Sequence, residues 1–442
     1  MERQTIWHPC TQMKDLEQYG LIRAHSGKGI YIYDEQGKSY IDAVSSWWVN
    51  LFGHANPRIA RAIAEQASQL EHVIFAGVTH EPARRLADRL VDLMPEDISR
   101  VFFADNGSAA VECAMKMSYG YRRNTGQAER NRFVYLTNGY HGETLGALSL
   151  CGEDLYTELY GPIMPRNIRA QGPDCFRCPY GRTRDDCACE CFEHMERILE
   201  EQASEITAVM VEPLAQFAGG FKFYPPLYLK KLRECTARHG VHLILDEIAT
   251  GFGRTGTMFA MEQAGITPDL VCVSKGVTSG TLPLSAVLTT DEIYGAFYAD
   301  YTEMKAFLHS HSYTGNPLAC AAAVETLNIF RDDDVINVNR AKAAHLRKAV
   351  EARFAGHPNV GEIRSLGFIC AVELVSDPAT KEPFDWKART GYQIYRKAVE
   401  RGALLRNLGD VVYFLPPYVI TEEQIDELAD IAIASVTDVL GE

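Results

Sequence analysis

The chain has 442 residues, of which 46% are hydrophobic and 23% are charged, as in ordinary globular proteins and unlike disordered or fibrous chains. This length favours one large domain with a smaller one attached. The formal net charge of -14 argues against nucleic acid or an anionic membrane as the main partner, because both would repel the protein, and favours small molecules.

The N-terminal sequence MERQTIWHPC lacks the basic start, apolar core and small-residue cleavage site of a signal peptide. No apolar run approaches the ~20 residues that a membrane helix needs. We therefore predict a cytoplasmic protein, in which the twelve cysteines are mostly reduced thiols and not a disulfide framework.

The periodicity of the chain changes twice and divides it into three parts. In residues 1–55, GIYIYDEQGKSYIDA alternates apolar and polar residues around a DEQGK turn and predicts a hairpin. In residues 56–330, two amphipathic helical segments precede short apolar runs that alternate with helices or turns, which predicts a mostly parallel sheet covered on both faces. Residues 331–442 contain two strand-like segments and a last helix opened by a capping box from Thr421 to Gln424, and predict a separate α+β lobe. The five apolar runs are RVFFAD, RFVYLT, ITAVMVE, VHLILDE and DLVCVSK.

Polar residues that end such strands are candidates for chemistry, because open α/β sheets bind ligands beyond the carboxyl ends of their strands. Lys275 ends the run in VCVSKGVTSG. An amine that is partly desolvated has a lowered pKa and can attack a carbonyl to form a Schiff base. The alternative is a lysine that caps a strand and extends its amine to water.

Asp246 ends the preceding apolar run, VHLILDE. An adjacent parallel strand would place this carboxylate beside Lys275. There it could hold a proton on a heteroaromatic nitrogen, which pyridoxal phosphate requires if its ring is to withdraw electrons. The alternative is an acidic N-cap of the next helix.

Two further strand ends complete the pattern. Gly107 and Ser108 open the helix in FFADNGSAAVECAMKM, where free N–H groups and the helix dipole would receive a phosphate. Tyr140, in NGYHGET, could stack on a flat ring. Taken singly, a Gly-Ser pair before a helix is far more often an N-cap than a phosphate site, and a tyrosine in such a loop is more often a packed loop aromatic. Together with Lys275 and Asp246 they fit one ligand, pyridoxal 5'-phosphate.

The motifs DEIATGFGRTG, SKG and GNPLACAAA resemble those of the class III, fold type I pyridoxal-phosphate-dependent aminotransferases, over nearly the whole chain. The resemblance implies a large domain with a mostly parallel seven-stranded sheet covered by helices. It also implies a smaller α+β domain built from the N-terminal segment and the C-terminal lobe. On the matching residues it implies an imine between Lys275 and the cofactor, Asp246 at the pyridine nitrogen, Tyr140 on the ring, and Gly107 and Ser108 at the phosphate.

The resemblance further implies a homodimer with shared active sites. The segment SHSYTGNP is similar to the family segment that contributes phosphate contacts from the partner subunit. Ser312 stands there at a position where threonine is frequent, so a hydroxyl is kept.

Within the family, IWHPCTQMKD, SSWW at 45–48 and LGDVVYFLPPY are similar to the biotin-pathway members that convert 8-amino-7-oxononanoate to 7,8-diaminononanoate. This acceptor is an apolar chain that ends in a carboxylate, so it needs an apolar wall and one fixed cation. The resemblance implies that Trp47 provides the wall and Arg406 the cation, with Tyr140 and Tyr413 as further substrate contacts.

The identity of the amino donor is open, because Cys10 stands where many of these relatives have a tyrosine. S-adenosylmethionine is the usual donor of the group and the one that we favour. Lysine is the alternative, since some relatives that use it also lack the tyrosine. Other readings are an omega-amino-acid or diamine aminotransferase, an aminomutase, and a sensor that binds the cofactor without turnover.

Residues 175–191 contain five cysteines in CFRCPYGRTRDDCACECFEH. Thiolates at this density can bind zinc or an iron-sulfur centre. The spacing lacks a second C-x2-C pair, however, so we expect a loop of reduced thiols near the substrate entrance and no metal site.

Overall fold

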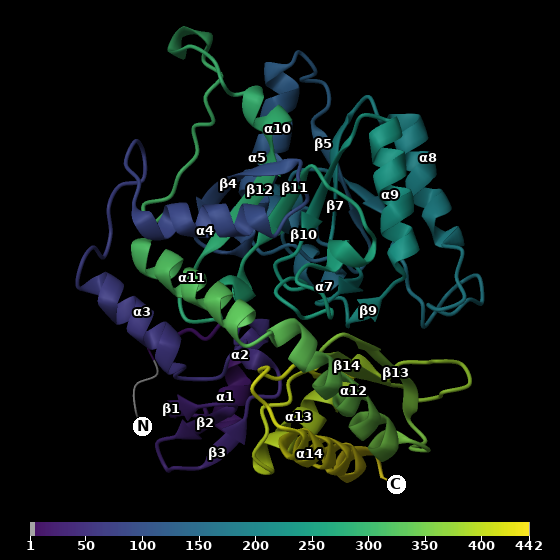
Figure 1. Ribbon diagram of the computed structural model, residues 1–442. Coiled ribbons are helices and arrows are strands. Elements are labelled where there is room, and N and C mark those ends of the chain that lie inside the picture. Colours follow the sequence, from purple (N-terminus) through teal and green to yellow (C-terminus); the bar gives the residue numbers. More distant parts are fainter. Residues whose placement is uncertain (1–4, 442) are drawn as a thin grey trace.

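The computed structural model describes residues 5–441 and consists of two lobes, the larger above the smaller in Figure 1. Residues 1–4, the start of the N-terminal segment MERQTIWHPC, lie outside the described part of the chain. Both termini of the described chain lie in or near the smaller lobe.

A seven-stranded sheet forms the centre of the large lobe, in the order β4-β12-β11-β10-β7-β5-β6. Strand β12 is antiparallel to both its neighbours, and the other pairs are parallel. This confirms the fold class, and the five predicted strands are all present. The sequence analysis missed the three-residue β6 and the partly polar β12. The strands are β4 (Ile98–Ala104), β5 (Arg132–Leu136), β6 (Ile168–Ala170), β7 (Ile206–Val211), β10 (His242–Asp246), β11 (Leu270–Val273) and β12 (Ser285–Thr290).

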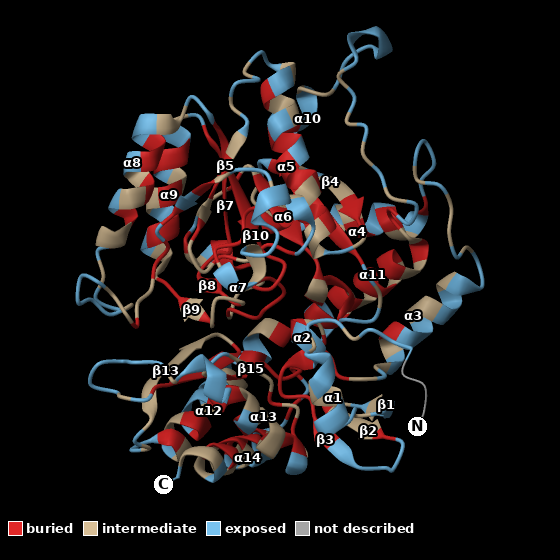
Figure 2. Cartoon of the chain, turned by 180° about the vertical axis from the view of Figure 1, so that it is seen from behind, coloured by how far each residue is buried: buried red, intermediate tan, exposed pale blue. Residues whose placement is uncertain are grey.

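Both faces of this sheet are buried, as Figure 2 shows for its central strands. Within β10, Leu243 and Leu245 belong to one hydrophobic cluster and Ile244 belongs to another, because successive side chains of a strand point to opposite faces. Helix α5 covers one face of the sheet. The cluster on the other face includes residues of α8, α9 and α11. The helices of this lobe are α3 (Pro57–Ala67), α4 (Glu81–Asp92), α5 (Gly107–Asn124), α6 (Leu145–Leu148), α7 (Asp154–Thr157), α8 (Glu193–Gln202), α9 (Pro226–Arg238), α10 (Asp291–Gly295) and α11 (Pro317–Asp332).

The small lobe joins the two ends of the chain. The backbone N–H of Ile41 donates to Gly402 O, and the N–H of Leu404 donates to Ile41 O, both at 2.8 Å. The predicted hairpin is present as β2 and β3, and the predicted capping box at Thr421 opens the last helix. The elements are α1 (Met13–Tyr19), β1 (Ala24–Lys28), β2 (Tyr31–Asp34), β3 (Ser39–Ile41), α2 (Ser45–Trp48), α12 (Val335–Phe354), β13 (Val360–Leu366), β14 (Ile369–Leu374), α13 (Thr390–Glu400), β15 (Asn407–Leu408), β16 (Val411–Phe414) and α14 (Glu422–Leu440).

A short hairpin of the large lobe, β8 (Ala215–Gln216) and β9 (Lys222–Phe223), lies at the junction with the small lobe. Within residues 5–441, no helix combines the length and the apolar character that crossing a membrane requires.

Candidate active site

A cavity of about 370 Å³ lies beyond the carboxyl ends of β10 and β11. It brings together six of the residues predicted from sequence, which come from separate segments of the chain: Trp47, Gly107, Ser108, Tyr140, Asp246 and Lys275. The carboxyl ends of neighbouring parallel strands share one edge of the sheet, so the strand-end rule accounts for the convergence of all these residues except Trp47, which reaches the cavity from the small lobe.

Lys275 lies two residues after the end of β11 and has a left-handed backbone conformation, with φ +38°. A non-glycine residue with this conformation carries backbone strain of about 1 kcal/mol or more and is typical of functional sites. Its amine lies 5.2 Å from the centre of the Trp48 ring. Burial lowers the pKa of Lys275, against the opposing effect of Asp246 and Glu212. A larger fraction of this amine is therefore uncharged, which is the form that attacks a carbonyl.

Asp246 is buried at the end of β10, and both its carboxylate oxygens have partners. The ring Nδ1 of His141 lies 2.7 Å from Oδ2, and the N–H of Ile248 donates to Oδ1 at 3.1 Å. These contacts fix the orientation of a carboxylate that lines the cavity. The other ring nitrogen of His141 is buried and has no partner within the described chain. The sequence analysis did not assign His141 to the site, because its contact with Asp246 joins two distant segments.

Helix α5 begins at the cavity, and Asn106 is its N-cap, with the side-chain oxygen accepting from Ala109 N at 3.0 Å. The first N–H groups of a helix have no acceptor within the helix and carry the positive end of its dipole. Here they belong to the cavity residues Gly107 and Ser108. A Cβ atom at Gly107 would lie 3.1 Å from Ile248, so glycine keeps this space open. The arrangement can hold a phosphate.

Tyr140 and Glu212 form one side of the cavity. Glu212 accepts the N–H of Tyr140 and the N–H of Phe217, each at 3.0 Å, which holds the tyrosine loop against β7. Burial and the charge of Asp246 raise the pKa of Glu212 to about 8, although both N–H groups oppose this shift. Sequence reasoning missed Glu212, yet it ends the apolar run ITAVMVE, so the strand-end rule was the signal that could have found it.

The two tryptophans lie on a left-handed turn. Residues Ser45–Trp48 are helical in hydrogen bonding but have φ values of 51°, 47°, 76° and 73°. Left-handed conformation costs roughly 1–2 kcal/mol for each non-glycine residue, so contacts from elsewhere must hold this turn. Trp48 is buried against Phe217, Phe221 and Tyr413. Trp47 is 41% exposed.

The tryptophan turn is joined to the lysine segment by Ser279. Its hydroxyl oxygen accepts the N–H groups of Leu51 and Phe52, at 3.2 and 3.1 Å. The backbone after the turn is therefore fixed relative to the backbone that carries Lys275.

Three predicted residues do not line this cavity. The Arg406 guanidinium lies 4.1 Å from the Trp47 ring centre and faces an adjoining cavity of about 340 Å³, and Cys10 lines both cavities. Tyr413 is buried behind Trp48, whose indole N–H donates to its hydroxyl at 3.2 Å. Ser312 is exposed on a loop. The predicted substrate contact of Tyr413 and the predicted phosphate contact of Ser312 across a dimer stay predictions.

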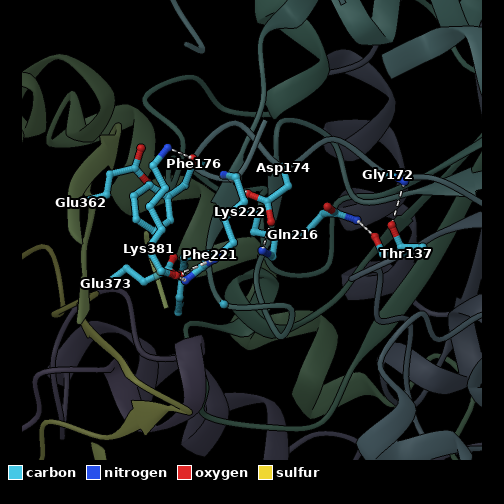
Figure 3. Close-up of polar contacts among 12 residues, drawn as sticks. Thr137, Gly172, Asp174, Phe176, Gln216, Phe221, Lys222, Glu362, Glu373 and Lys381 are labelled. Carbon is cyan, nitrogen blue, oxygen red and sulfur yellow. Dashed lines mark hydrogen bonds and ion pairs between the residues drawn. The ribbon is translucent and has the colours of Figure 1, made fainter. Parts of the chain in front are cut away.

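The cysteine-rich segment contacts both lobes near the site. Figure 3 shows Lys222 of β9 paired with Asp174, and the Lys381 amine donating to the carbonyl of Phe176. The side chain of Gln216 donates to Thr137 O at 2.8 Å. The Lys222 pair holds the segment against the β8–β9 hairpin, the Lys381 bond joins the segment to the small lobe, and the Gln216 bond joins the hairpin to the loop after β5.

All five cysteines line one cavity of about 560 Å³: Cys175, Cys178, Cys187, Cys189 and Cys191. Burial raises the pKa of Cys175 to about 12, which favours the protonated thiol over the thiolate that a metal needs. Among residues 5–441, no group of three or more His, Cys, Asp or Glu side chains is arranged to hold a metal ion.

We expect protein purified without oxygen to contain less than ~0.2 equivalents of zinc or iron, because in the described part of the chain these thiols do not form a group of three or more that could hold the ion. Elemental analysis of such protein measures this directly. A stoichiometric amount of either metal that is lost when Cys175 and Cys178 are replaced by serine would contradict the expectation.

Comparison with known proteins gives full-length matches. The family described as aminotransferase class III matches residues 14–436. The adenosylmethionine-8-amino-7-oxononanoate aminotransferase of Geobacter sulfurreducens is 43% identical over 441 residues, which covers 100% of this chain and 97% of the relative.

Solved structures of similar enzymes also match the chain over nearly its whole length. The enzyme of the same name from Methanocaldococcus jannaschii superimposes with a TM-score of 0.93 at 36% identity and covers 99% of this chain and 97% of its own. An amine transaminase from an uncultivated Pseudomonas species, in its PLP-bound form, gives a TM-score of 0.93 at 32% identity and covers 99% of each chain.

Proposed function

Because the chain belongs to the class III aminotransferases, we propose that it transfers an amino group from S-adenosylmethionine to 8-amino-7-oxononanoate. The product, 7,8-diaminononanoate, is an intermediate of biotin biosynthesis. Relatives that carry this activity in their names match the chain over its whole length. The observation that carries the proposal is the pairing of Trp47 with Arg406 beside a cavity that contains a buried lysine and aspartate.

The enzyme uses pyridoxal 5'-phosphate, and the cavity residues fit this group. Gly107 and Ser108 would hold its phosphate, Tyr140 would lie against its ring, Asp246 would face the ring nitrogen, and Lys275 would bind its aldehyde. When bound, the cofactor carries the amino group between donor and acceptor and withdraws electrons from the carbon that loses a proton.

The protein's own groups then supply acid–base chemistry and orientation. Asp246, held by His141, would keep a proton on the ring nitrogen, because a buried carboxylate stabilises positive charge at the atom that it faces. The Lys275 amine, whose pKa is lowered by burial, would accept the proton from the donor α carbon and would deliver it to the carbon of the cofactor that carried the aldehyde.

The substrate side requires an apolar surface and a cation at a fixed separation. The Trp47 indole provides the surface, and the Arg406 guanidinium that packs on it provides the cation. A guanidinium binds a carboxylate with two parallel hydrogen bonds, so Arg406 can fix the end of the acceptor chain. With the carboxylate of the acceptor bound at Arg406, the keto group of the acceptor would lie at the end of the chain nearer to Lys275.

We also propose that the enzyme acts in the cytoplasm as a homodimer with shared sites. Ser312 is exposed and lies outside the cavity of its own chain, which is consistent with a role at the site of a partner subunit.

A test of the reaction is to mix the cofactor-loaded enzyme with one amine at a time. We expect S-adenosylmethionine to convert the yellow cofactor band to the band of its amine form, and alanine and diamines to leave it unchanged. Subsequent addition of 8-amino-7-oxononanoate should restore the yellow band and release 7,8-diaminononanoate, detected by mass spectrometry.

Lysine is the second candidate donor. Cys10 lines the cavity and stands where many relatives have a tyrosine, so a hydroxyl that could contact the donor is absent. If lysine converts the band and S-adenosylmethionine does not, lysine becomes the donor in the proposal and the acceptor stays the same. Conversion by diamines with no use of 8-amino-7-oxononanoate would favour an omega-aminotransferase. Failure to find the keto product of the donor would favour an aminomutase, and a band that no amine changes would favour a sensor.

A further inference from the structure

Asp42 is a fully buried carboxylate next to the tryptophan turn, and the catalytic roles described above do not use it. Its Oδ1 accepts the backbone N–H of Ser46 at 2.8 Å, and its Oδ2 accepts the Ser46 hydroxyl at 2.7 Å. Oδ2 also lies 3.0 Å from Nε2 of His54. One buried side chain thus binds the second residue of the turn through both its backbone and its side chain.

A chain of hydrogen bonds fixes the orientation of the carboxylate. Asn50 Nδ2 donates to Nδ1 of His54 at 3.2 Å, which leaves Nε2 of His54 to donate to Asp42. The backbone of His54 is itself held, because its N–H donates to Gly29 O at 2.7 Å. Asp42 therefore cannot turn away from Ser46 without leaving several polar groups in the interior unpaired.

The far end of the same turn is held by a buried cation. The Arg254 guanidinium donates to the carbonyls of Asn50, at 3.0 Å, and Pro416, at 3.1 Å, and lies 3.5 Å from the carbonyl of Trp48. Asp42 thus satisfies N–H and O–H donors at the start of the turn, and Arg254 satisfies carbonyls at its end. The left-handed conformation is unfavourable by itself, and these two charged groups supply bonds that compensate for it.

The consequence concerns the substrate wall. Ser46 precedes Trp47, so its position sets where the Trp47 ring emerges and where Arg406 packs on that ring. On the other side of the turn, Trp48 contacts the Lys275 amine. Loss of the Ser46 bonds would allow the turn to relax toward a right-handed conformation and would move the wall before it affected the buried Lys275 and Asp246.

We propose that Asp42 is a positioning residue for the amino acceptor: it holds the left-handed turn at Ser45–Trp48 and thereby places Trp47 and Arg406 against the acceptor chain. This proposal rests on the proposed function, since it assigns the wall to 8-amino-7-oxononanoate. It makes Asp42 a determinant of acceptor affinity, although Asp42 contacts neither substrate nor cofactor.

The test compares Asp42→Asn with the wild-type holoenzyme in steady-state kinetics. The amide replaces one acceptor oxygen with an NH2 group, so the Ser46 hydroxyl and His54 can no longer both donate to this side chain. We expect KM for the acceptor to rise about tenfold or more, as loss of a charge-assisted hydrogen bond does, with kcat changed less than about threefold.

Asp34→Asn is the matched control. Asp34 is buried in the same lobe and also accepts three hydrogen bonds, from Gln36 N, Lys38 N and the Tyr40 hydroxyl. It has no contact with the tryptophan turn. We expect a comparable loss of thermal stability in this variant and a KM for the acceptor within about twofold of wild type.

Ser46→Ala is the second variant, which keeps the backbone N–H bond and removes only the hydroxyl bond to Asp42. We expect it to fold and to raise the acceptor KM about threefold, in the same direction as Asp42→Asn. The proposal is overturned if Ser46→Ala leaves KM unchanged, or if Asp42→Asn and Asp34→Asn lower stability equally with no difference in KM. Failure of the proposed function would be distinct, since the wild-type enzyme would then not convert the acceptor.

Discussion

Replacing Lys275 with alanine should reduce turnover to less than ~1% of the wild-type rate. The variant loses the only lysine of the cavity-lining set, and with it both the group that binds the cofactor aldehyde and the base that moves the proton. Alanine lacks the side chain of Lys275 beyond Cβ, and this side chain lines the cavity, so we expect the fold to be kept and the chemistry to be lost. Steady-state amination of 8-amino-7-oxononanoate, followed by mass spectrometry of the product, measures the effect.

Lys342→Ala is the matched control for this substitution. Burial lowers the pKa of Lys342 as well, and its amine donates to Tyr418 O at 2.8 Å, but it lies on α12, outside the cavity. We expect this variant to keep most of its activity. Borohydride reduction and peptide mapping of the wild-type holoenzyme should place the cofactor label on Lys275. A label on another side chain, or more than ~1% activity in Lys275→Ala, would contradict the assignment.

Asp246→Asn should lower kcat by about 100-fold or more, because an uncharged amide does not keep a proton on the ring nitrogen. The side chain keeps nearly the same volume, and Oδ1 can still accept the N–H of Ile248. Cofactor binding, measured by the absorbance that remains after gel filtration, should therefore change much less than turnover.

The control for Asp246→Asn is Asp269→Asn, at the residue before the neighbouring strand β11. Asp269 accepts from Arg233 at 2.9 Å and from Leu243 N, and it precedes β11, at the opposite edge of the sheet from the cavity. We expect its replacement to lower thermal stability with little effect on kcat. Equal kcat values for the two variants would show that the charge of Asp246 is not required for the chemistry.

Strand ends could be located from sequence alone. Lys275, Asp246 and Tyr140 each follow an apolar run bounded by turn residues, and Gly107 opens a helix after such a run. Because parallel strands share one carboxyl edge, a local pattern repeated along the chain was sufficient to bring these residues together at one cavity. The same rule would have reached Glu212, which ends β7.

Partners that come from distant segments could not be found in this way. The contact of His141 with Asp246, in the large lobe, and the packing of Arg406 on Trp47, in the small lobe, depend on how segments that are far apart in the sequence meet in the folded chain. No periodicity in a single sequence records such pairs. The segment resemblance selected Trp47 and Arg406, but their contact is a property of the folded chain.

By itself, the sequence determined the layered α/β sheet and the residues placed at its carboxyl edge, because hydrophobic periodicity and strand ends are local features of the chain. Only the tertiary structure decided the left-handed conformation of Ser45–Trp48. Intrinsic preference opposes this conformation at each of its residues, and hydrogen bonds from Asp42 and Arg254, which are distant from each other in sequence, hold it in place.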